Sequence, residues 1–179
     1  SLNLDYVTPQ SAIGGNGSYG IVPGFNFHAT TFSVSFWMKS KLVSDTETIF
    51  DKYVKSGDLR VLRLYLDASE ELQLQISTDG TGSNSEVQKT TNANLSANTW
   101  YHIVITYTGG TWLVYKDTAT VSLDAAAFST ATSVEQNAID LWIGQSQDTE
   151  NPFNGELDDI SIYNDVLSLP EVTRNYKAG

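Results

Sequence analysis

Short segments of alternating apolar and polar residues recur along this chain, and they limit its possible folds more than any other feature. In Arg60–Asp67, for example, leucines at every second position alternate with Arg63 and Tyr65. Such a segment fits a strand with one face in a core and the other toward solvent. Segments of this kind follow one another roughly every 8–12 residues, and only Ser168–Tyr176 has helical spacing. The chain is therefore predicted to be all-β, a two-sheet antiparallel β-sandwich with one short C-terminal helix.

Residues that favour turns bound each of the expected strands. The strands are Ser1–Val7, Ser18–Val22, Phe32–Met38, Glu47–Val54, Arg60–Asp67, Glu71–Ser77, Trp100–Tyr107, Thr111–Lys116, Ala119–Asp124, Ile139–Gly144 and the end of Phe153–Tyr163. Large apolar side chains on the inward faces are expected to meet between the two sheets. The best placed are Phe36, Ile103, Ile105, Ile143, Ile160 and Ile162.

The size and composition of the chain fit a single domain, residues 1–179. Its 179 residues can bury a core without staples, and it contains no cysteine for a disulfide or a thiolate site. The only methionine is Met38, which predicts a mature or excised domain. No apolar run approaches the roughly 20 residues that a membrane-spanning helix requires, so no membrane span is expected.

The formal net charge of −11 is unevenly distributed. All of the excess negative charge lies between Asp117 and Thr173, a stretch that contains no Lys or Arg. Two interpretations are open: a solvated acidic face that keeps the domain soluble, or a surface that attracts divalent cations. Both argue against nucleic acid as a partner, because the sequence has no basic stripe to contact phosphates.

The segment Phe153–Tyr163 combines a Gly turn, an alternating strand and an acidic pair. Strand alternation places Asp158 in phase with Ile160 and Ile162, on the apolar face. An unpaired carboxylate on such a face would cost several kcal/mol. Asp158 is therefore expected to be satisfied by backbone N–H groups, by water or by a cation.

Four motifs together resemble a known family. They are Phe153–Tyr163 followed by Leu167, Ser168 and Glu171; Phe32–Met38; Trp100–Tyr107; and Leu141–Gly144. Their order and spacing are similar to those of the laminin-G-like jelly rolls of the concanavalin A-like lectin/glucanase superfamily. The resemblance covers nearly the whole chain, and it implies that the predicted sandwich is a jelly roll.

The same resemblance implies a structural calcium ion. In the β-glucanases that share the fold, the Asp at the start of the last strand commonly binds calcium together with carbonyl oxygens from the beginning of the chain. Transferred to this sequence, the ligands are Asp158 and the segment Asn16-Gly17. Calcium prefers such oxygen ligands. The alternative is that Asp158 accepts backbone N–H bonds from that early turn.

One turn departs from the family pattern. Relatives carry Asp-Gly or Asn-Gly in the hairpin turn that corresponds to Asp117-Thr118, and these pairs suit a two-residue loop. Here Thr118 stands in place of the glycine. The turn is therefore predicted to be longer or of another type.

Neither of the two histidines has an acid or nucleophile beside it in sequence, and no catalytic residues are predicted. Retaining glycosidases need two carboxyl groups about 5–5.5 Å apart, which enzymes of this fold place on one strand as Glu-x-Asp-x-Glu. The nearest approach is Asp45, Glu47 and Asp51, whose alternation Ile49 interrupts. Without cysteine or clustered histidine, a zinc site is not expected either. The chain is predicted not to be an enzyme.

Two residues inside expected strands are assigned structural roles. Trp37 points away from the apolar face of Phe32–Met38, and we expect it to be packed under a neighbouring loop or sheet rather than to serve as a sugar platform. His102 lies within a strand that is apolar on both faces. We expect it to be a core or hydrogen-bonded residue rather than a ligand or base.

Candidate ligand-binding residues lie at one loop and on one strand. The polar loop between the last two strands supplies Gln145, Gln147, Asp148 and Asn151. Trp112 and Tyr115 lie on opposite faces of Thr111–Lys116, so one of them can be exposed; Trp112 is the candidate for stacking on a sugar.

These observations favour a non-catalytic carbohydrate-binding or adhesion module, stabilised by calcium. Its partner would be a polysaccharide or other glycan, and its place would be extracellular or surface-exposed, on a cell or a virion. The alternative is a protein–protein interaction domain of the laminin-G type, whose partner is a surface protein. A glycan-degrading enzyme is the least favoured interpretation. All three rest on fold analogy.

Overall fold

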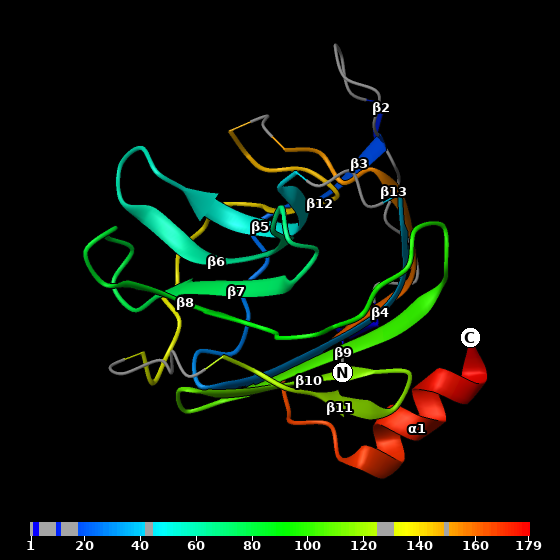
Figure 1. Cartoon of the computed structure of the whole chain (residues 1–179). Helices are drawn as coiled ribbons and strands as arrows, with labels where there is room; N and C mark the ends of the chain where they lie inside the picture. Colours follow the sequence, from blue (N-terminus) through cyan, green and yellow to red (C-terminus); the bar gives the residue numbers. More distant parts are fainter. Residues whose placement is uncertain (1, 4–9, 12–17, 42–44, 125–130, 149–150) are drawn as a thin grey trace.

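A computed structural model describes residues 2–3, 10–11, 18–41, 45–124, 131–148 and 151–179 (Figure 1). Within this part of the chain the strands form two antiparallel sheets, of six and seven strands. In spatial order the six-stranded sheet contains β1 (Leu2–Asn3), β13 (Gly155–Tyr163), β4 (Thr31–Ser40), β9 (Tyr101–Thr108), β10 (Thr111–Lys116) and β11 (Ala119–Val121). The seven-stranded sheet contains β2 (Gln10–Ser11), β3 (Ser18–Val22), β12 (Leu141–Ile143), β5 (Glu47–Val54), β6 (Leu59–Leu66), β7 (Leu72–Ser77) and β8 (Ser85–Lys89).

The strand order is that of a jelly-roll sandwich, so the predicted fold class is confirmed. Strands distant in sequence pair at the centre of each sheet: β13 pairs with β4, and β12 pairs with both β3 and β5. The segments from β5 to β8 form a meander of hairpins, as the sequence predicts. Of the first expected strand, only Leu2–Asn3 lies within the described residues.

The core lies between the sheets. Phe36, Ile103 and Ile105 of the six-stranded sheet pack in one cluster with buried side chains of the seven-stranded sheet, which include Phe50, Leu64 and Leu74. Of the six predicted core residues, five are buried and Ile160 is partly buried against the same cluster. The core prediction therefore holds, with Ile160 at its margin.

A β-bulge in β13 changes which face Asp158 occupies. Asp158 is paired with Trp37, but the next paired residue, Ser161, is opposite Ser35, so β13 has one residue more than β4 over this interval. Asp159 has a left-handed φ of 48°. The bulge directs both Leu157 and Ile160 toward the core and leaves Asp158 exposed. The prediction that Asp158 shares the apolar face of Ile160 and Ile162 is wrong, because it assumed unbroken alternation.

The turn at Asp117-Thr118 is also shorter than predicted. Lys116 is paired with Ala119, which leaves a two-residue loop between β10 and β11. Both loop residues have positive φ, 50° for Asp117 and 77° for Thr118, as a type I′ turn requires. A type I′ turn matches the twist of the two flanking strands. Thr118 therefore adopts a left-handed conformation in which glycine is favoured and β-branched residues are rare.

Helix α1 (Leu169–Ala178) covers the outer face of the six-stranded sheet (Figure 1). It begins at a capping box, in which the Ser168 backbone N–H donates to the Glu171 carboxylate over 2.8 Å. Val172 is buried against Val104 and Leu167. Among the described residues, no helix is long and apolar enough to cross a membrane.

The helix also accounts for the two strand residues assigned structural roles. Trp37 stacks on Tyr176 of α1 with ring centroids 5.6 Å apart, so it is packed under another element, although that element is the C-terminal helix and not the loop or sheet that the sequence suggested. His102 is buried on the same face, and its Nε2 lies 2.9 Å from the Ser35 hydroxyl. Its interpretation as a hydrogen-bonded core histidine is confirmed.

Candidate functional site

The predicted binding loop after β12 lies against strand β5. The Gln147 side-chain amide donates to the backbone carbonyls of Asp51 and Asp140, over 3.2 and 2.7 Å. The Asn151 carbonyl accepts from the Thr48 backbone N–H over 2.9 Å. Gln145 is partly buried and Asp148 is exposed. Gln147 and Asn151 therefore attach the loop to the sheet, whereas Asp148 is accessible at its rim.

Trp112 is not available for stacking on a sugar. Its side chain is 1% exposed, belongs to the core cluster, and donates from Nε1 to Gln88 Oε1 over 2.5 Å. The alternation of β10 is such that Trp112 faces inward and Leu113 outward. The prediction that Trp112 binds a ligand is therefore wrong. Tyr115 lies on the opposite face of β10 and is partly buried against the cluster under α1.

The predicted calcium ligands are only partly described. Asn16 and Gly17 lie outside the described residues. Asp158 is exposed and accepts the backbone N–H of Asp159 over 2.9 Å. Within the described residues there is no group of three or more His, Asp or Glu side chains that could hold a metal. A single carboxylate joined by backbone carbonyls would not form such a group, so calcium at Asp158 stays a prediction.

The outer face of the seven-stranded sheet carries a row of large side chains that sequence reasoning did not identify. Across strands β12, β5, β6 and β7, Trp142 is opposite Asp51, Asp51 is opposite Arg63, and Arg63 is opposite Gln75. Their strand neighbours Leu62, Leu64 and Leu74 point the other way, into the core. Alternation thus aligns an indole, a carboxylate, a guanidinium and an amide on one surface.

Arg63 is held between two tyrosines at the centre of this row. Its guanidinium carbon lies 5.4 Å from the ring centroid of Tyr53 and 5.5 Å from that of Tyr65. Arg63 Nε is 3.4 Å from Asp51 Oδ2, and the Arg63 side chain is 11% exposed. Cation–π contacts and the ion pair together fix the planar group in one orientation.

Asp51 is fully buried beneath Arg63. Burial raises the pKa of its carboxyl to about 7, and the positive charge of Arg63 opposes the rise without cancelling it. The backbone N–H groups of Tyr53 and Gln147 also favour the charged form. Nevertheless, neither carboxylate oxygen has a hydrogen-bond partner of good geometry among the described residues. The row therefore contains an ionisable group that is costly to keep charged.

An aromatic pair forms one end of the row. Tyr19 of β3 and Trp142 of β12 stack with ring centroids 5.0 Å apart and planes inclined by 3°. Both side chains are partly exposed. Stacked aromatic rings with accessible edges and faces are suited to contacts with the apolar face of a sugar ring.

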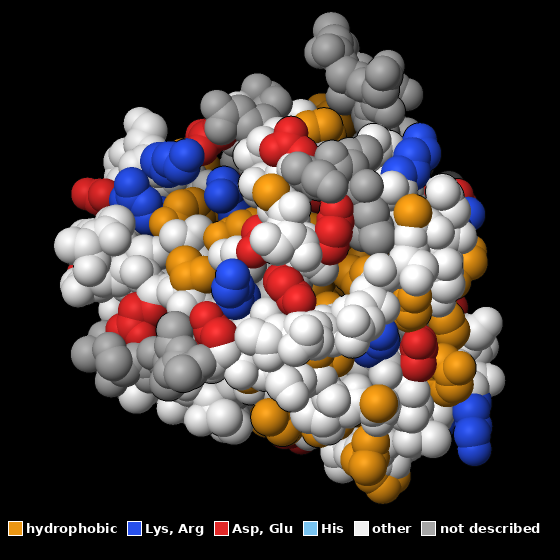
Figure 2. Space-filling view, viewed as in Figure 1, with side chains coloured by type: hydrophobic (Ala, Val, Ile, Leu, Met, Phe, Trp, Pro, Cys, Tyr) orange, Lys and Arg blue, Asp and Glu red, His pale blue; other side chains and the backbone are white. Residues whose placement is uncertain are grey.

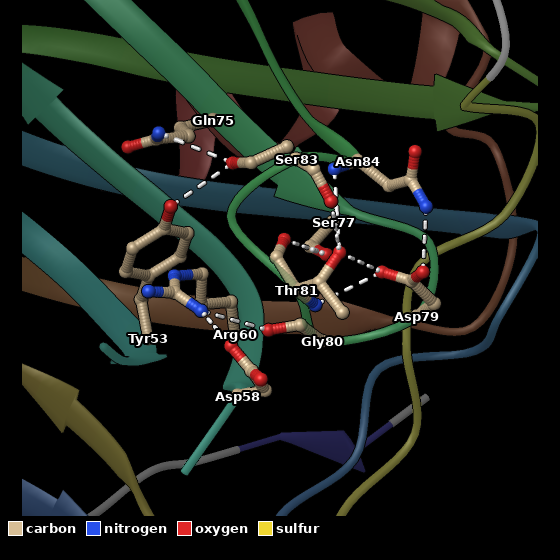
Figure 3. A network of polar contacts seen from close by, with 11 residues as sticks. Tyr53, Asp58, Arg60, Gln75, Ser77, Asp79, Gly80, Thr81, Ser83 and Asn84 are labelled. Carbon is tan, nitrogen blue, oxygen red and sulfur yellow. Dashed lines mark hydrogen bonds and ion pairs between the residues drawn. The ribbon is translucent and has the colours of Figure 1, made fainter. Parts of the chain in front are cut away.

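Amides and hydroxyls form the other end. Tyr65 donates its hydroxyl to Gln73 Oε1 over 2.6 Å, and Gln75 Nε2 donates to the Ser85 hydroxyl over 3.2 Å. The Tyr53 hydroxyl is 3.0 Å from the same Ser85 oxygen (Figure 3). These side chains are partly or fully oriented by one another, as expected of groups that fix the hydroxyls of a ligand.

Two loops beside this end are tied down by polar contacts (Figure 3). Asp79 accepts the backbone N–H and the hydroxyl of Thr81 and the side-chain amide of Asn84, over 2.9, 2.8 and 2.6 Å. These bonds, with that from Asn84 first, hold the pKa of Asp79 below its ordinary value. Arg60 donates to Asp58 and to the Gly80 carbonyl, which links the two loops. Figure 2 shows Lys and Arg side chains gathered where β5 turns into β6.

The nearest approach to a glycosidase motif, Asp45, Glu47 and Asp51, is interrupted by a bulge in β5. On β5, Thr48 is opposite Tyr65 and Phe50 is opposite Leu64, so Ile49 is the extra residue. As a result Glu47, which accepts from the Ser40 hydroxyl over 3.0 Å, faces the sheet interior while Asp51 faces outward. Two carboxyl groups on opposite faces of a sheet cannot act on one glycosidic bond.

Comparison with known proteins places the fold. A family model described as the concanavalin A-like lectin/glucanases superfamily matches residues 14–173. No curated protein sequence matches the chain. Among solved structures, a heptameric SAP-like pentraxin from Limulus polyphemus superposes with a TM-score of 0.62 at 16% identity, over 97% of this chain and 82% of its own.

Two further structures share the architecture over part of their length. The binding domain of botulinum neurotoxin DC, solved in complex with rat synaptotagmin II, has a TM-score of 0.67 at 14% identity, over 97% of this chain and 45% of its own. A protein of Bacteroides ovatus proposed to bind carbohydrate has a TM-score of 0.64 at 16% identity, over 87% and 44%. The chain spans about 40% of the length of the first botulinum receptor-binding domains it matches. At these identities the structures establish the fold alone, and the family model shows that the chain belongs to the concanavalin A-like lectin/glucanase superfamily.

Proposed function

We propose that this chain is a non-catalytic carbohydrate-binding module and that the outer face of the seven-stranded sheet is its binding surface. The observation that carries the proposal is the row of Trp142, Asp51, Arg63 and Gln75 across four adjacent strands. Aromatic faces beside oriented amides and one charged group are the usual composition of a sugar site. Family membership and the Bacteroides ovatus structure support this class of ligand.

The setting we propose is extracellular or surface-exposed. Structures with this fold include receptor-binding domains of botulinum neurotoxins and a pentraxin. The neurotoxin domains bind receptors, and the Bacteroides ovatus protein is proposed to bind carbohydrate. A non-catalytic role also agrees with the separation of Glu47 from Asp51 by the bulge in β5.

Binding to a surface protein is the second candidate. The botulinum neurotoxin domain was solved with synaptotagmin, a protein partner. In addition, Leu113 and Leu169 are 41% and 51% exposed on the side of the six-stranded sheet where α1 begins. Exposed apolar side chains of this kind occur at protein interfaces.

The test of carbohydrate binding compares two tryptophan variants on a broad panel of polysaccharides. Trp142→Ala removes the aromatic end of the row, and we expect it to weaken binding at least tenfold. Trp100→Ala is the matched control, because Trp100 is 38% exposed beside Lys39 at the six-stranded sheet. Binding of no glycan by the wild-type chain would favour the protein partner, and release of reducing ends from a glycan would show an enzyme.

Calcium stabilisation is a separate part of the proposal. It is supported by the exposure of the Asp158 carboxylate on β13. Ligand binding to the native state raises stability by about 2.7 kcal/mol at a hundredfold excess over Kd. We expect the melting temperature to rise when millimolar calcium is added to chelator-treated protein, and Asp158→Asn to abolish the rise. Identical melting curves with chelator and with calcium would contradict the proposal that calcium stabilises the chain.

A further inference from the structure

The central residue of the proposed binding face, Arg63, has donors that the protein leaves unused. Its contact with Asp51 runs through Nε over 3.4 Å, and this nitrogen makes no hydrogen bond of good geometry. The two Nη nitrogens donate no hydrogen bond within the described residues, and neither is among the buried nitrogens that lack a partner. A guanidinium clamped by Tyr53 and Tyr65 therefore presents its fork toward the exposed side of the sheet.

The geometry of that fork selects one kind of ligand group. Parallel N–H donors of arginine match the two oxygens of a carboxylate, which binds them bidentately. The stacked tyrosines hold the guanidinium plane, so little side-chain entropy remains to be lost when the anion arrives. Beside it, Gln73, Gln75 and Ser85 offer amides and a hydroxyl for sugar hydroxyl groups.

Asp51 is a competing anion built into the same site. Among the described residues, Asp51 is the acidic side chain that forms an ion pair with Arg63; Asp58 pairs with Arg60, and Asp67 with Lys89. Opposite Asp51 on β12 is the uncharged Trp142, and the loop that covers it contributes the uncharged Gln147. Lys52, the next residue, points to the other side and donates to the carbonyls of Asn137 and Ile139.

We infer that this face binds a carboxylate-bearing sugar of the uronic acid class, with Arg63 as the anion-binding residue and Asp51 as the internal counterion that must take up a proton. The inference rests on the proposed function and specifies its ligand. Two carboxylates on one guanidinium repel each other, so the ligand anion favours the protonated form of Asp51, whose burial already raises its pKa to about 7. Binding is thus coupled to uptake of one proton from solution.

The charge around this face is mixed, so the inference rests on the local position of Arg63 rather than on the net charge. The β5–β8 hairpins contain five basic residues, which are Lys52, Lys55, Arg60, Arg63 and Lys89, and eight acidic residues, which are Glu47, Asp51, Asp58, Asp67, Glu70, Glu71, Asp79 and Glu86. Strand β12 of the same face lies within the acidic stretch from Asp117 to Thr173. The remaining repulsion acts at longer range and is screened at physiological salt within about 8 Å.

The test measures binding of polygalacturonate and alginate, each against its esterified form, which keeps the sugar backbone and removes the charge. We expect at least one polyuronate to bind at least tenfold more tightly than its ester at pH 6. Its affinity should fall up to tenfold per unit as the pH rises from 7 to 8. Uronate carboxyl groups, with pKa values near 3.5, stay ionised throughout this range. The two histidines do not face the site: His102 lies under α1, and His28 bonds to Thr31.

Two variants separate the roles of the charged pair. Arg63→Gln should abolish the preference for polyuronate over ester, measured as the ratio of the two affinities in the same variant. Asp51→Asn should bind polyuronate at pH 8 as tightly as the wild type does at pH 6, with no further pH dependence. This second variant keeps the inference testable if Arg63→Gln does not fold.

Failure of the inference differs from failure of the proposed function. Equal binding of polyuronate and ester that Trp142→Ala weakens would overturn the uronate inference and leave carbohydrate binding intact. An unchanged pH dependence in Asp51→Asn would likewise contradict the role of Asp51. Absence of binding to any polysaccharide, charged or neutral, would overturn both.

Discussion

The two sheets of this sandwich differ in what they place on their outer faces. Under α1, the six-stranded sheet presents the small side chains of Ser33, Ser35 and Thr106 around the buried Val104, and beside them Trp37 and His102 pack against Tyr176 of the helix. The seven-stranded sheet presents Trp142, Arg63 and two tyrosines, and no helix of the described residues covers them (Figure 1). The small residues allow the helix to approach the first sheet, and an aromatic residue of the helix covers the large ones. The first face is built to be covered by the chain itself, and the second has the composition of a surface that contacts a ligand.

Hydrogen bonding follows the same division. On the covered face, the Ser33 hydroxyl donates to the Asp165 carbonyl over 2.7 Å and accepts the Leu167 backbone N–H over 2.9 Å, so its capacity is used by the segment leading into α1. On the other face, Asp51 is buried without a full set of hydrogen bonds, and the Arg63 fork is unused. An unsatisfied polar centre costs stability, and such costs are typical of functional sites.

The largest effect is expected from disrupting the covered face. Val172→Asp would place a charge against the buried apolar side chains of Val104 and Leu167. We expect the free energy of unfolding to fall by about 3–5 kcal/mol, measured by chemical denaturation, because an unpaired charge is buried. Arg174→Asp on the exposed side of α1 is the control and should cost less than about 1 kcal/mol. A small effect of Val172→Asp would mean that α1 is not a structural cover.

The second prediction concerns the free-energy cost of burying the ionised Asp51 carboxylate. The folded-state pKa of Asp51 is about 7, above the ordinary 3.8, so the folded protein binds this proton more tightly than the unfolded chain does. The stabilisation that results is present at low pH and is lost as the pH rises toward 7. A difference of this size corresponds to roughly 4 kcal/mol. Asp51→Asn removes the charge, and Arg63 then loses its partner, which offsets part of the gain.

We therefore expect Asp51→Asn to raise the free energy of unfolding by about 1–3 kcal/mol at pH 8 and to change it little at pH 4. Urea denaturation of both proteins at these two pH values measures the difference. A variant that is less stable than the wild type at pH 8 would show that the charged pair stabilises the fold, and the contrast between the two faces would then be lost.

The third prediction concerns the edge of the covered sheet. Thr118 occupies a left-handed conformation, φ 77°, in the turn between β10 and β11. Thr118→Gly should raise stability by about 1 kcal/mol, because glycine adopts this conformation without the steric penalty. The midpoint of urea denaturation should rise while glycan affinity stays unchanged, since the turn belongs to the other sheet. Lower stability would mean that the threonine side chain contributes contacts that outweigh its strain.

How far the sequence predicts this molecule depends on the regularity of its strands. Where strand pairing is regular, as along β9 and β12, counting every second residue correctly places buried side chains such as Ile103 and Ile143. The bulges at Ile49 and Asp159 invert alternation in the middle of a strand, and nothing in the local composition marks them. Unbroken alternation would place Asp158 on the apolar face of β13 and would place Glu47 and Asp51 on the same face of β5. The two bulges move Asp158 to the outer face and separate Glu47 from Asp51.

The sequence does not reveal the proposed binding face, for a different reason. Its members are separated in sequence, from Asp51 to Trp142, and only strand pairing brings them into one row. A signal was present in β6, where Arg63 and Tyr65 interrupt a run of leucines. Trp112 is wrong as a ligand-binding residue for another reason. Alternation predicts that one of the two aromatic residues of β10, Trp112 or Tyr115, faces outward, but it does not say which one. Leu113 and Tyr115 share that outward face, which the identity of the residues alone does not reveal.

The most direct test of the proposed binding face is an NMR titration of the labelled chain with an oligosaccharide that it binds. We expect perturbed backbone amides to cluster on β12, β5, β6 and β7, around Trp142, Arg63 and Gln75, and amides of β4, β9 and α1 to remain unperturbed. Perturbations confined to the six-stranded sheet or to α1 would contradict the account, because the ligand would then occupy the face that the chain covers for itself.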